Sequence, residues 1–277
     1  MVHASLKAKL RCAGLTDTGK VREHNEDMIA HDSGIGLLVL ADGMGGYNAG
    51  EVASGLAIKI IVQMVRDAVE REDLAVGDRK AGLSRAAIIL RDAVARANKV
   101  IHQTARSQPG CEGMGTTVVA GLFHDNKVTL AHVGDSRAYR LRGRQLKQVT
   151  SDHSLLQELV DRGFYSPEEA QRAGNKNYVT RALGVDAEVE VELQEQAVER
   201  GDIWLLCSDG LNDMVQDDDI HLTLGTFGAN LEAAGRQLVK LANDNGGKDN
   251  VSVLMAEVVE SFPARSGIIG QILKRFS

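Results

Sequence analysis

The sequence has few cysteines and few prolines, and each scarcity excludes a kind of protein. Its three cysteines lie far apart and form no CxxC pair, so neither a disulfide framework nor a zinc knuckle is expected. Unpaired thiols are typical of a reducing compartment, and we therefore expect a cytoplasmic protein. Only three prolines occur, and the chain contains no visible low-complexity stretch or internal repeat.

Long apolar runs and an excess of positive charge are missing too. The apolar run 35–41 is far too short to cross a bilayer, and residues 1–15 lack the apolar core of a signal peptide. The net charge is −6, whereas a nucleic-acid-binding protein usually carries a basic patch. We therefore expect no transmembrane segment and no nucleic-acid partner. The excess of acidic residues is consistent with carboxylates gathered at a metal site.

The chain is long enough for one domain with a substantial core, since 43% of its 277 residues are hydrophobic. We place the end of this domain near residue 259. The tail 260–277 has apolar residues at helical spacing beside Lys274 and Arg275, which predicts an amphipathic segment. It could dock on the protein itself, on a partner or weakly on an anionic membrane, and self-docking or disorder is the favoured alternative.

Short β-like runs outnumber helical patterns. Apolar residues recur at helical spacing over 52–69, 86–101 and 230–243, and the polar stretch 152–174 also has a helical pattern. Strands are predicted over 6–14, 36–41, 116–123, 127–133, 136–141, 189–193, 203–207 and 251–258. The helices come in groups and do not alternate with the strands. This pattern favours an α+β fold with antiparallel hairpins.

Four aspartates stand next to predicted strands. Asp42 and Asp209 each follow an apolar run and precede a glycine, Asp135 follows Gly134, and Asp249 precedes the last strand. Each one alone is consistent with a solvated turn. Together they suggest a site for a hard cation such as Mg²⁺ or Mn²⁺, which prefers oxygen ligands.

Arg22 lies four and five residues before the paired acids Glu26 and Asp27. Such an arginine could form a surface salt bridge of little energetic value. Alternatively, it could offer its guanidinium fork to a phosphate, beside acids that organise metal-bound water.

Taken in order, these segments resemble the metal-dependent protein serine/threonine phosphatases of the 2C type, in a bacterial-like form. The resemblance runs from about Lys9 to Val258. It is carried by Arg22…Glu26-Asp27, Asp42-Gly43-Met44-Gly45-Gly46, Gly113-Met114-Gly115-Thr116-Thr117, Gly134-Asp135-Ser136-Arg137, Thr180-Arg181-Ala182-Leu183-Gly184, Ser208-Asp209-Gly210 and Asp249-Asn250.

The resemblance implies a β-sandwich of two antiparallel sheets flanked by α-helices on both faces, in four α-β-β-α layers. Residues 1–259 would form the catalytic domain. Two Mn²⁺ or Mg²⁺ ions, with a third ion in some bacterial relatives, would lie at one edge of the sandwich.

The resemblance also implies a role for each site residue. Asp42 would bridge two ions, and Arg22 would bind the phosphoryl oxygens; both are the implied catalytic residues. The other implied ligands are Asp209, Asp249, the carbonyl of Gly43, Glu26 through water, and Asp135 for a third ion, with Asp27 and Asn250 in the surrounding shell.

The activity implied is hydrolysis of phosphoserine and phosphothreonine in proteins by a metal-activated water, opposing a Ser/Thr kinase. The alternatives are an inactive phosphatase-fold scaffold and a sandwich protein with a purely structural cation. The intact aspartates disfavour the first alternative, and Arg22 beside the acids disfavours the second. The oligomeric state stays open, with a monomer favoured.

Several other residues are expected to have no direct catalytic role. Met44 stands where many eukaryotic relatives carry a histidine that is a candidate general acid, so the resemblance leaves the leaving-group proton without an assigned donor. We expect His153 on the surface, His24 and His132 in structural roles, and Cys207 in the core. The charged stretch 152–176 resembles the variable flap of the family and is expected to be a solvated helix pair.

Overall fold

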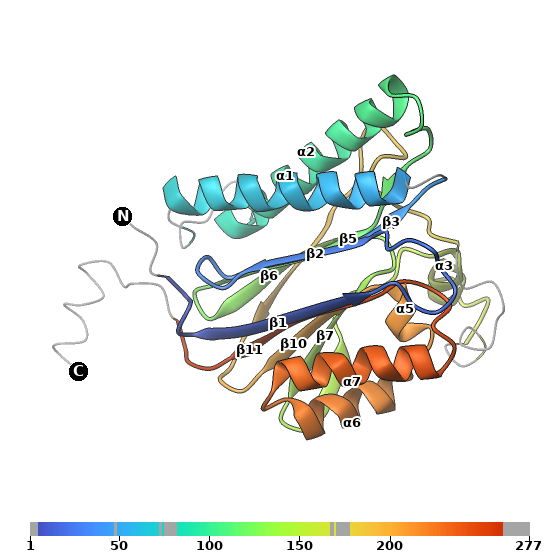
Figure 1. Ribbon diagram of the computed structural model, residues 1–277. Helices are drawn as coiled ribbons and strands as arrows, with labels where there is room; N and C mark the ends of the chain where they lie inside the picture. Colours follow the sequence, from blue (N-terminus) through green and yellow to red (C-terminus); the bar gives the residue numbers. More distant parts are fainter. Residues whose placement is uncertain are drawn as a thin grey trace.

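The computed structural model describes residues 5–46, 49–71, 74, 82–166, 169 and 178–262. Two sheets stack face to face, with one pair of long helices on the outer face of each sheet (Figure 1). The elements are β1 (Leu10–Asp17), β2 (Asp27–Asp32), β3 (Leu37–Met44), α1 (Ala49–Arg71), α2 (Arg85–Ser107), β4 (Gly115–Thr116), β5 (Val118–His124), β6 (Lys127–Val133), β7 (Arg137–Arg142), β8 (Gln145–Gln148), α3 (Leu155–Asp161), β9 (Glu192–Ala197), β10 (Ile203–Cys207), α5 (Asp209–Asn212), α6 (Asp217–Phe227), α7 (Leu231–Asp244) and β11 (Val251–Val258).

Both sheets are antiparallel. One has the strand order β1-β11-β10-β7-β8, and the other has the order β2-β3-β5-β6-β9, with β4 pairing to β3. The helices α1 and α2 cover the sheet that contains β3, whereas α6 and α7 cover the sheet that contains β10 (Figure 1). The four-layer α-β-β-α arrangement expected from the sequence is therefore confirmed.

The core explains why some strands read as continuous apolar runs. Leu37 to Ala41 in β3 are all buried, because one face of this strand packs under α1 and the other packs against the second sheet. Between the sheets, the rings of Phe123 and Trp204 meet edge to face, with centroids 6.3 Å apart. Strands covered on both faces lose the alternation that a half-exposed strand shows.

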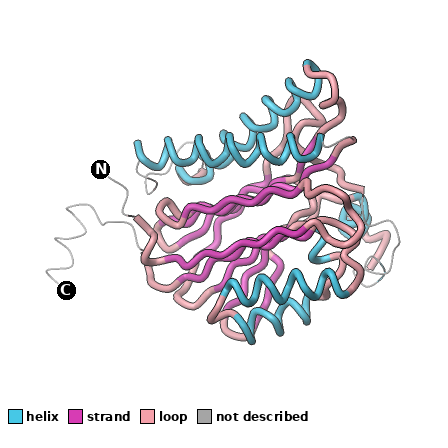
Figure 2. Tube along the Cα trace, viewed as in Figure 1, coloured by secondary structure: helices cyan, strands magenta, loops and turns pink. Residues whose placement is uncertain are grey.

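One end of the sandwich collects the segments that matter for function. β3, β6 and β10 end there, β2 and β11 begin there, and loops join them at this end (Figures 1 and 2). The antiparallel pairings β2·β3, β5·β6 and β10·β11 fix this arrangement. The polar segments predicted next to strands are thereby brought to one edge of the fold.

The strands predicted over 127–133, 203–207 and 251–258 and the three long helices are present. The strand predicted over 6–14 is shifted to Leu10–Asp17, and the one predicted over 189–193 begins at Glu192. In that last region Val189, Val191 and Leu193 pack against the helical layer, and the ladder with β6 forms further along the chain. The strands β2 and β8 and the helix α6 were not predicted.

The predicted tail lies mostly outside the described residues. Phe262 is buried in the core between the sheets, and its peptide N–H donates to Oδ1 of Asn126. The division into 1–259 and 260–277 stays a prediction. Of the stretch expected to form the flap, α3 and the residues up to 166 and residue 169 are described, and 167–168 and 170–177 lie outside the described residues. Among the described residues, no helix is long and apolar enough to cross a membrane.

Candidate metal centre

Two carboxylates face each other across β2 and β3. Asp27 and Asp42 are directly paired in the antiparallel register, where opposite Cβ atoms are about 5 Å apart and like charges repel. Ser208 donates a hydrogen bond to Oδ2 of Asp27 at 2.8 Å. Oδ1 of Asp27 is buried without a hydrogen-bond partner among the described residues. A proton or a cation is therefore needed to offset the repulsion between these two side chains.

Asp209 and Asp249 reach the same edge from the second sheet. β10 and β11 pair antiparallel, so the residues that follow β10 and those that precede β11 are neighbours. A Cβ atom at Gly210 would lie 2.0 Å from the carbonyl oxygen of Asn250, and Gly210 has no positive φ. The Asp-Gly sequence is thus required by the close contact of the two aspartate-bearing segments and not by turn geometry.

The carboxylates act on one another electrostatically. Burial, and next the neighbouring Asp27, raise the pKa of Asp42 well above its ordinary value. Burial, and next Asp135 and Asp249, do the same to the pKa of Asp209. Burial also raises the pKa of Asp27 to about 6. A bound cation inverts this effect because it favours the ionised carboxylate.

The oxygen-only donor set fits Mn²⁺ or Mg²⁺. Oδ1 of Asp27 has no hydrogen-bond partner among the described residues, and the pKa values of the neighbouring carboxyl groups are raised. Both features are expected where buried carboxylates lie close together without a positive charge between them. Among the described residues, no three of these carboxylates bring their oxygens within 4.8 Å of one another. The predicted ligands therefore lie at one edge of the fold, but their oxygens are too far apart to contact one ion together.

Arg22 lies beside this acidic group. Its Nη2 donates to Oδ2 of Asp249 at 2.6 Å, and about half of its side chain is exposed. The hydrogen bond to Asp249 raises the pKa of Arg22. Asn250 holds the segment that carries the arginine, because its Nδ2 donates to the carbonyl oxygens of Thr18 and His24 and its Oδ1 accepts from the N–H of Glu26.

Gly43 and Glu26 lie where α1 begins. The N–H of Gly43 donates to the carbonyl oxygen of Glu26 at 3.1 Å. The carboxylate of Glu26 accepts from the N–H of Gly50, in the first turn of α1, at 3.1 Å. A Cβ atom at Gly43 would lie 2.3 Å from the carbonyl oxygen of Gly50. A glycine is therefore needed at position 43, and its own carbonyl stays next to Asp42.

The threonines of the Gly113–Thr117 motif hold Asp42 in place. The hydroxyl of Thr116 and the N–H of Thr117 both donate to the carbonyl oxygen of Asp42, at 2.8 Å each. The hydroxyl of Thr117 lies 2.7 Å from that of Ser136. Thr116 also pairs with Leu183 through two backbone hydrogen bonds. Four segments of the sequence resemblance thus form one hydrogen-bonded frame around Asp42.

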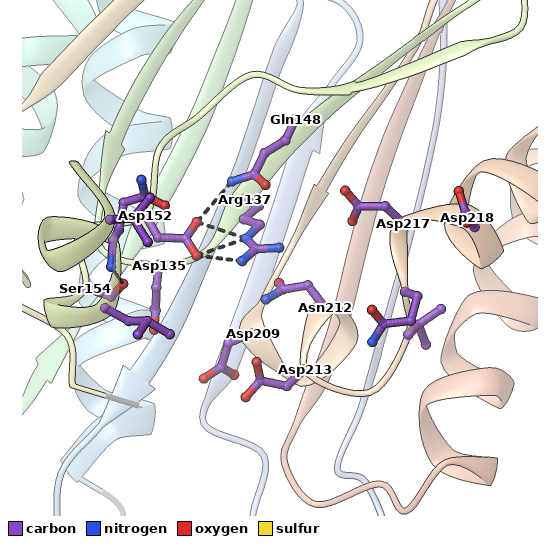
Figure 3. Close-up of a pocket in the computed structure, with 15 residues that line it drawn as sticks. Asp135, Arg137, Gln148, Asp152, Ser154, Asp209, Asn212, Asp213, Asp217 and Asp218 are labelled. Carbon is purple, nitrogen blue, oxygen red and sulfur yellow. Dashed lines mark hydrogen bonds and ion pairs between the residues drawn. The ribbon is translucent and has the colours of Figure 1, made fainter. Parts of the chain in front are cut away.

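Asp135 follows β6 and is 7% exposed. Burial, and next the charge of Asp152, raise its pKa to about 6. Together with Asp209, it lines a cavity of about 510 Å³ beside the acidic group (Figure 3). Arg137 points into the same cavity and forms a forked pair with Asp152, with Nε to Oδ1 at 2.9 Å and Nη2 to Oδ2 at 2.7 Å.

The expectation of a surface position for His153 is wrong, because the side chain is only 7% exposed. Its Nδ1 accepts from the N–H of Gly134 at 3.1 Å, so Nε2 carries the proton and donates to Glu192 at 3.2 Å. His132 is buried as well, and its Nε2 donates to the carbonyl oxygen of Gly134 at 2.8 Å. The two histidines therefore clamp the peptide groups next to Asp135, a role that sequence reasoning missed.

Cys207 lies in the core as expected. Its side chain is fully buried, and burial raises the pKa of the thiol to about 12. A thiol of this kind is protonated at neutral pH and is a poor nucleophile. Met44 ends β3 beside Asp42 and has no proton to donate.

Comparison with known proteins agrees with this geometry. The profile of the family described as "Protein phosphatase 2C" matches residues 19–249. The serine/threonine protein phosphatase PstP of Mycobacterium tuberculosis is 42% identical over 252 residues, which make up 91% of this chain and 45% of PstP. The chain thus spans less than half the length of that relative. The serine/threonine phosphatase stp of Listeria monocytogenes is 36% identical over 87% of this chain and 93% of its own length.

Among solved structures, the catalytic domain of PstP in complex with two manganese ions superposes with a TM-score of 0.78 at 41% identity. The match covers 91% of this chain and 99% of that one. The sequence motifs, the sandwich and these matches agree along nearly the whole described chain. This chain belongs to the protein phosphatase 2C family.

Proposed function

We propose that this protein is a metal-dependent phosphatase that hydrolyses phosphoserine and phosphothreonine in other proteins. The observation that carries the proposal is the edge of the sandwich at which Asp42 faces Asp27, with Asp209 and Asp249 adjacent and Arg22 at 2.6 Å from one of these carboxylates. A binding protein with a structural cation would gain nothing from an exposed guanidinium there. The similarity to a phosphatase domain that holds two manganese ions supports the same conclusion.

Each site residue has a proposed role. Asp42 would lie between two ions, with Asp209 and Asp249 on one and the carbonyl of Gly43 on the other. Glu26 would act through water, Asp135 would serve a third ion, and Asp27 and Asn250 would orient the ligands. When bound, Mn²⁺ or Mg²⁺ supplies positive charge to the phosphoryl oxygens and lowers the pKa of a water molecule.

The chain's own groups then bind and orient the substrate. Arg22 is exposed enough to exchange its partner Asp249 for two phosphoryl oxygens, which match its planar fork. With water as the proposed nucleophile, no covalent phosphoenzyme is needed, and the buried, protonated thiol of Cys207 is not required to attack phosphorus. Met44 supplies no proton, so the proton for the leaving alkoxide would come from a water molecule or from another group.

The proposal is tested by Mn²⁺-dependent release of phosphate from phosphothreonine and phosphoserine peptides. We expect release by the wild-type protein and a large loss in the Asp209→Asn variant, which keeps the side-chain shape but removes the charge. No release by folded wild-type protein in excess Mn²⁺, together with no effect of the variant, would leave the inactive-scaffold alternative as the correct one.

The bridging role of Asp42 has its own test. Because it would contact two ions, Asp42→Asn should weaken Mn²⁺ binding more than Asp249→Asn does. Isothermal titration measures both affinities without requiring turnover. Equal or unchanged Mn²⁺ affinity in the Asp42 variant would refute the bridging role.

We also propose that the substrates are phosphorylated by a partner Ser/Thr kinase, which this phosphatase opposes. The described cysteines are free thiols, which supports a reducing, cytoplasmic setting. We propose a monomer as the working unit. Phosphoproteins retained by the Asp209→Asn variant would identify the substrates, and a kinase retained among them would be the partner kinase.

A further inference from the structure

A cavity leads away from the metal centre toward α6. It is about 510 Å³ in volume and lies between α3 and the link from α5 to α6 (Figure 3). Asp135 and Asp209 line it on the side of the metal centre, and Asp217 and Asp218 line the opposite side. A substrate whose phosphate lies at the metal centre would therefore place a neighbouring residue in this cavity.

The charged side chains in the described lining of the cavity are mostly acidic. Among the lining residues that the structure describes, Arg137 alone is cationic, and its guanidinium is already matched by the carboxylate of Asp152 through three hydrogen bonds. The other charged lining residues are Asp135, Asp209, Asp213, Asp217 and Asp218. Asp217 accepts a hydrogen bond from the hydroxyl of Tyr139 at 3.0 Å.

Neither Asp217 nor Asp218 forms an ion pair with a lysine, arginine or histidine within the part of the chain that the structure describes. Asp135, the proposed ligand of a third ion, faces the cavity from the side of the metal centre. It is more than nine-tenths buried and makes no hydrogen bond or ion pair with the other residues drawn in Figure 3.

Apolar side chains line the cavity on both sides. Leu156 and Val160 on α3 and Val215 before α6 contribute aliphatic side chains. The stems of lysine and arginine consist of methylene groups, which pack on such side chains while the charged head reaches a polar end. A glutamate or a phosphate would meet like charge in the same place. The chemistry of the cavity therefore suits one class of side chain.

We propose that this cavity binds an arginine or lysine of the substrate protein, close in sequence to the phosphorylated residue. The side chain packs along Leu156 and Val160, and its charged head pairs with Asp217 and Asp218. These two carboxylates lie outside the proposed metal ligands and keep their charge when ions are bound. The proposal rests on the proposed function and names its substrate class: phosphoproteins with a basic residue beside the phosphosite.

Matched phosphothreonine peptides test the proposal in Mn²⁺. Within one set, the peptides differ at a single position, which carries arginine, glutamine or glutamate. Successive sets place this position from three residues before the phosphothreonine to three residues after it. At the position that reaches the cavity, we expect arginine to lower KM about fivefold relative to glutamine, with glutamate highest. The preference should shrink as salt screens the charges, and kcat should change little.

Variants locate the effect. Asp218→Asn should bring the KM ratio of glutamine to arginine peptides toward one, and Asp218→Lys should favour the glutamate peptide. Asp219→Asn is the matched control, because Asp219 is an exposed residue of the same helical turn that does not line the cavity. It should keep the wild-type ratio. Thermal unfolding and Mn²⁺ affinity verify that each variant is folded.

Hydrolysis of p-nitrophenyl phosphate, which has no flanking residue, separates this proposal from the proposed function. If the wild-type protein hydrolyses it while arginine, glutamine and glutamate peptides share one KM at every position, only the present proposal fails. The present proposal also fails if Asp218→Asn and Asp219→Asn reduce the preference equally. The preference would then come from the overall negative charge of this surface and not from binding in the cavity. No hydrolysis of any substrate rejects the proposed function itself.

Discussion

Replacement of Asp27 by asparagine should stabilise the metal-free protein at neutral pH. Burial raises the pKa of Asp27 from 3.8 to about 6, which corresponds to about 3 kcal/mol of unfavourable interaction in the ionised form. Asparagine keeps the shape, can still accept the hydrogen bond from Ser208 and can donate to the carboxylate of Asp42. Because the carboxylates are coupled and their effects overlap, we expect a gain of about 2 kcal/mol in the free energy of unfolding at pH 7.

The sign of the pH dependence follows from proton linkage. A carboxyl group whose pKa is higher in the folded state binds more protons there than in the unfolded state. Its contribution to stability is therefore lost as the pH rises from about 4 to about 6, and it stays lost above that range. Asp135, with a pKa raised to about 6, acts in the same direction.

His132 acts in the opposite direction. Burial, and next His153, lower its pKa to about 4, so stability is lost as the pH falls from about 6.5 to about 4. Asp27→Asn leaves this contribution in place. The difference between the wild type and the variant therefore reports Asp27 together with its coupling to Asp42, whatever the overall pH profile of the protein is.

Urea unfolding in a chelator at pH 4.5, 6 and 7.5 measures this difference. Trp204 is buried and reports unfolding by fluorescence. We expect the two proteins to be nearly equal at pH 4.5 and the variant to be more stable at pH 7.5. Saturating Mn²⁺ should reverse the order, since bound cations stabilise the ionised wild-type group. A difference that is the same at all three pH values would refute the electrostatic account.

Three further predictions concern packing around the site. Gly210→Ala should lower the free energy of unfolding by about 3 kcal/mol or more, because its Cβ would lie 2.0 Å from the carbonyl oxygen of Asn250. The control is Gly225→Ala on exposed α6, which has open space around it and should be neutral or stabilising by up to about 1 kcal/mol. Urea unfolding compares the two variants. His153→Ala should lower stability by about 2 kcal/mol, since it leaves a buried peptide N–H and a carboxylate without their partner, and His153→Gln should recover part of the loss. Phe262→Ala should lower stability by about 3 kcal/mol in thermal unfolding, and an unchanged Tm would show that this residue does not pack on the core.

The sequence predicted those parts of the site that depend on local signals. Asp42 and Asp209 each follow an apolar run and precede glycine, and this pattern alone marks the end of a buried strand. The pairing of Asp27 with Asp42 could not be predicted, since β2 is short and polar and carries no clear alternation. Its register is fixed by the neighbouring strand β3 and not by its own residues.

The helix α6 shows a signal that was present but missed. Its three leading aspartates suggest a loop, yet acidic residues in a first helical turn are favoured by the helix dipole. Ile220, Thr223 and Leu224 then follow at i, i+3 and i+4 and are all buried. His153 had no such signal, because its burial depends on Glu192, 39 residues further along the chain.

The segment from β10 to α6 carries both a proposed metal ligand and the residues proposed to bind the substrate, and the fold places the two in different surroundings. Asp209 is fixed by the sheet, since Gly210 packs against the start of β11 with no room for a side chain. Asp217 and Asp218 lie only eight and nine residues later, but they stand on the exposed first turn of a surface helix. Under the proposed recognition, substitutions there would change which phosphoproteins bind without moving the residues proposed to hold the metal. Substrate preference in this chain is therefore expected to depend on the surface turn, while the chemistry depends on the core.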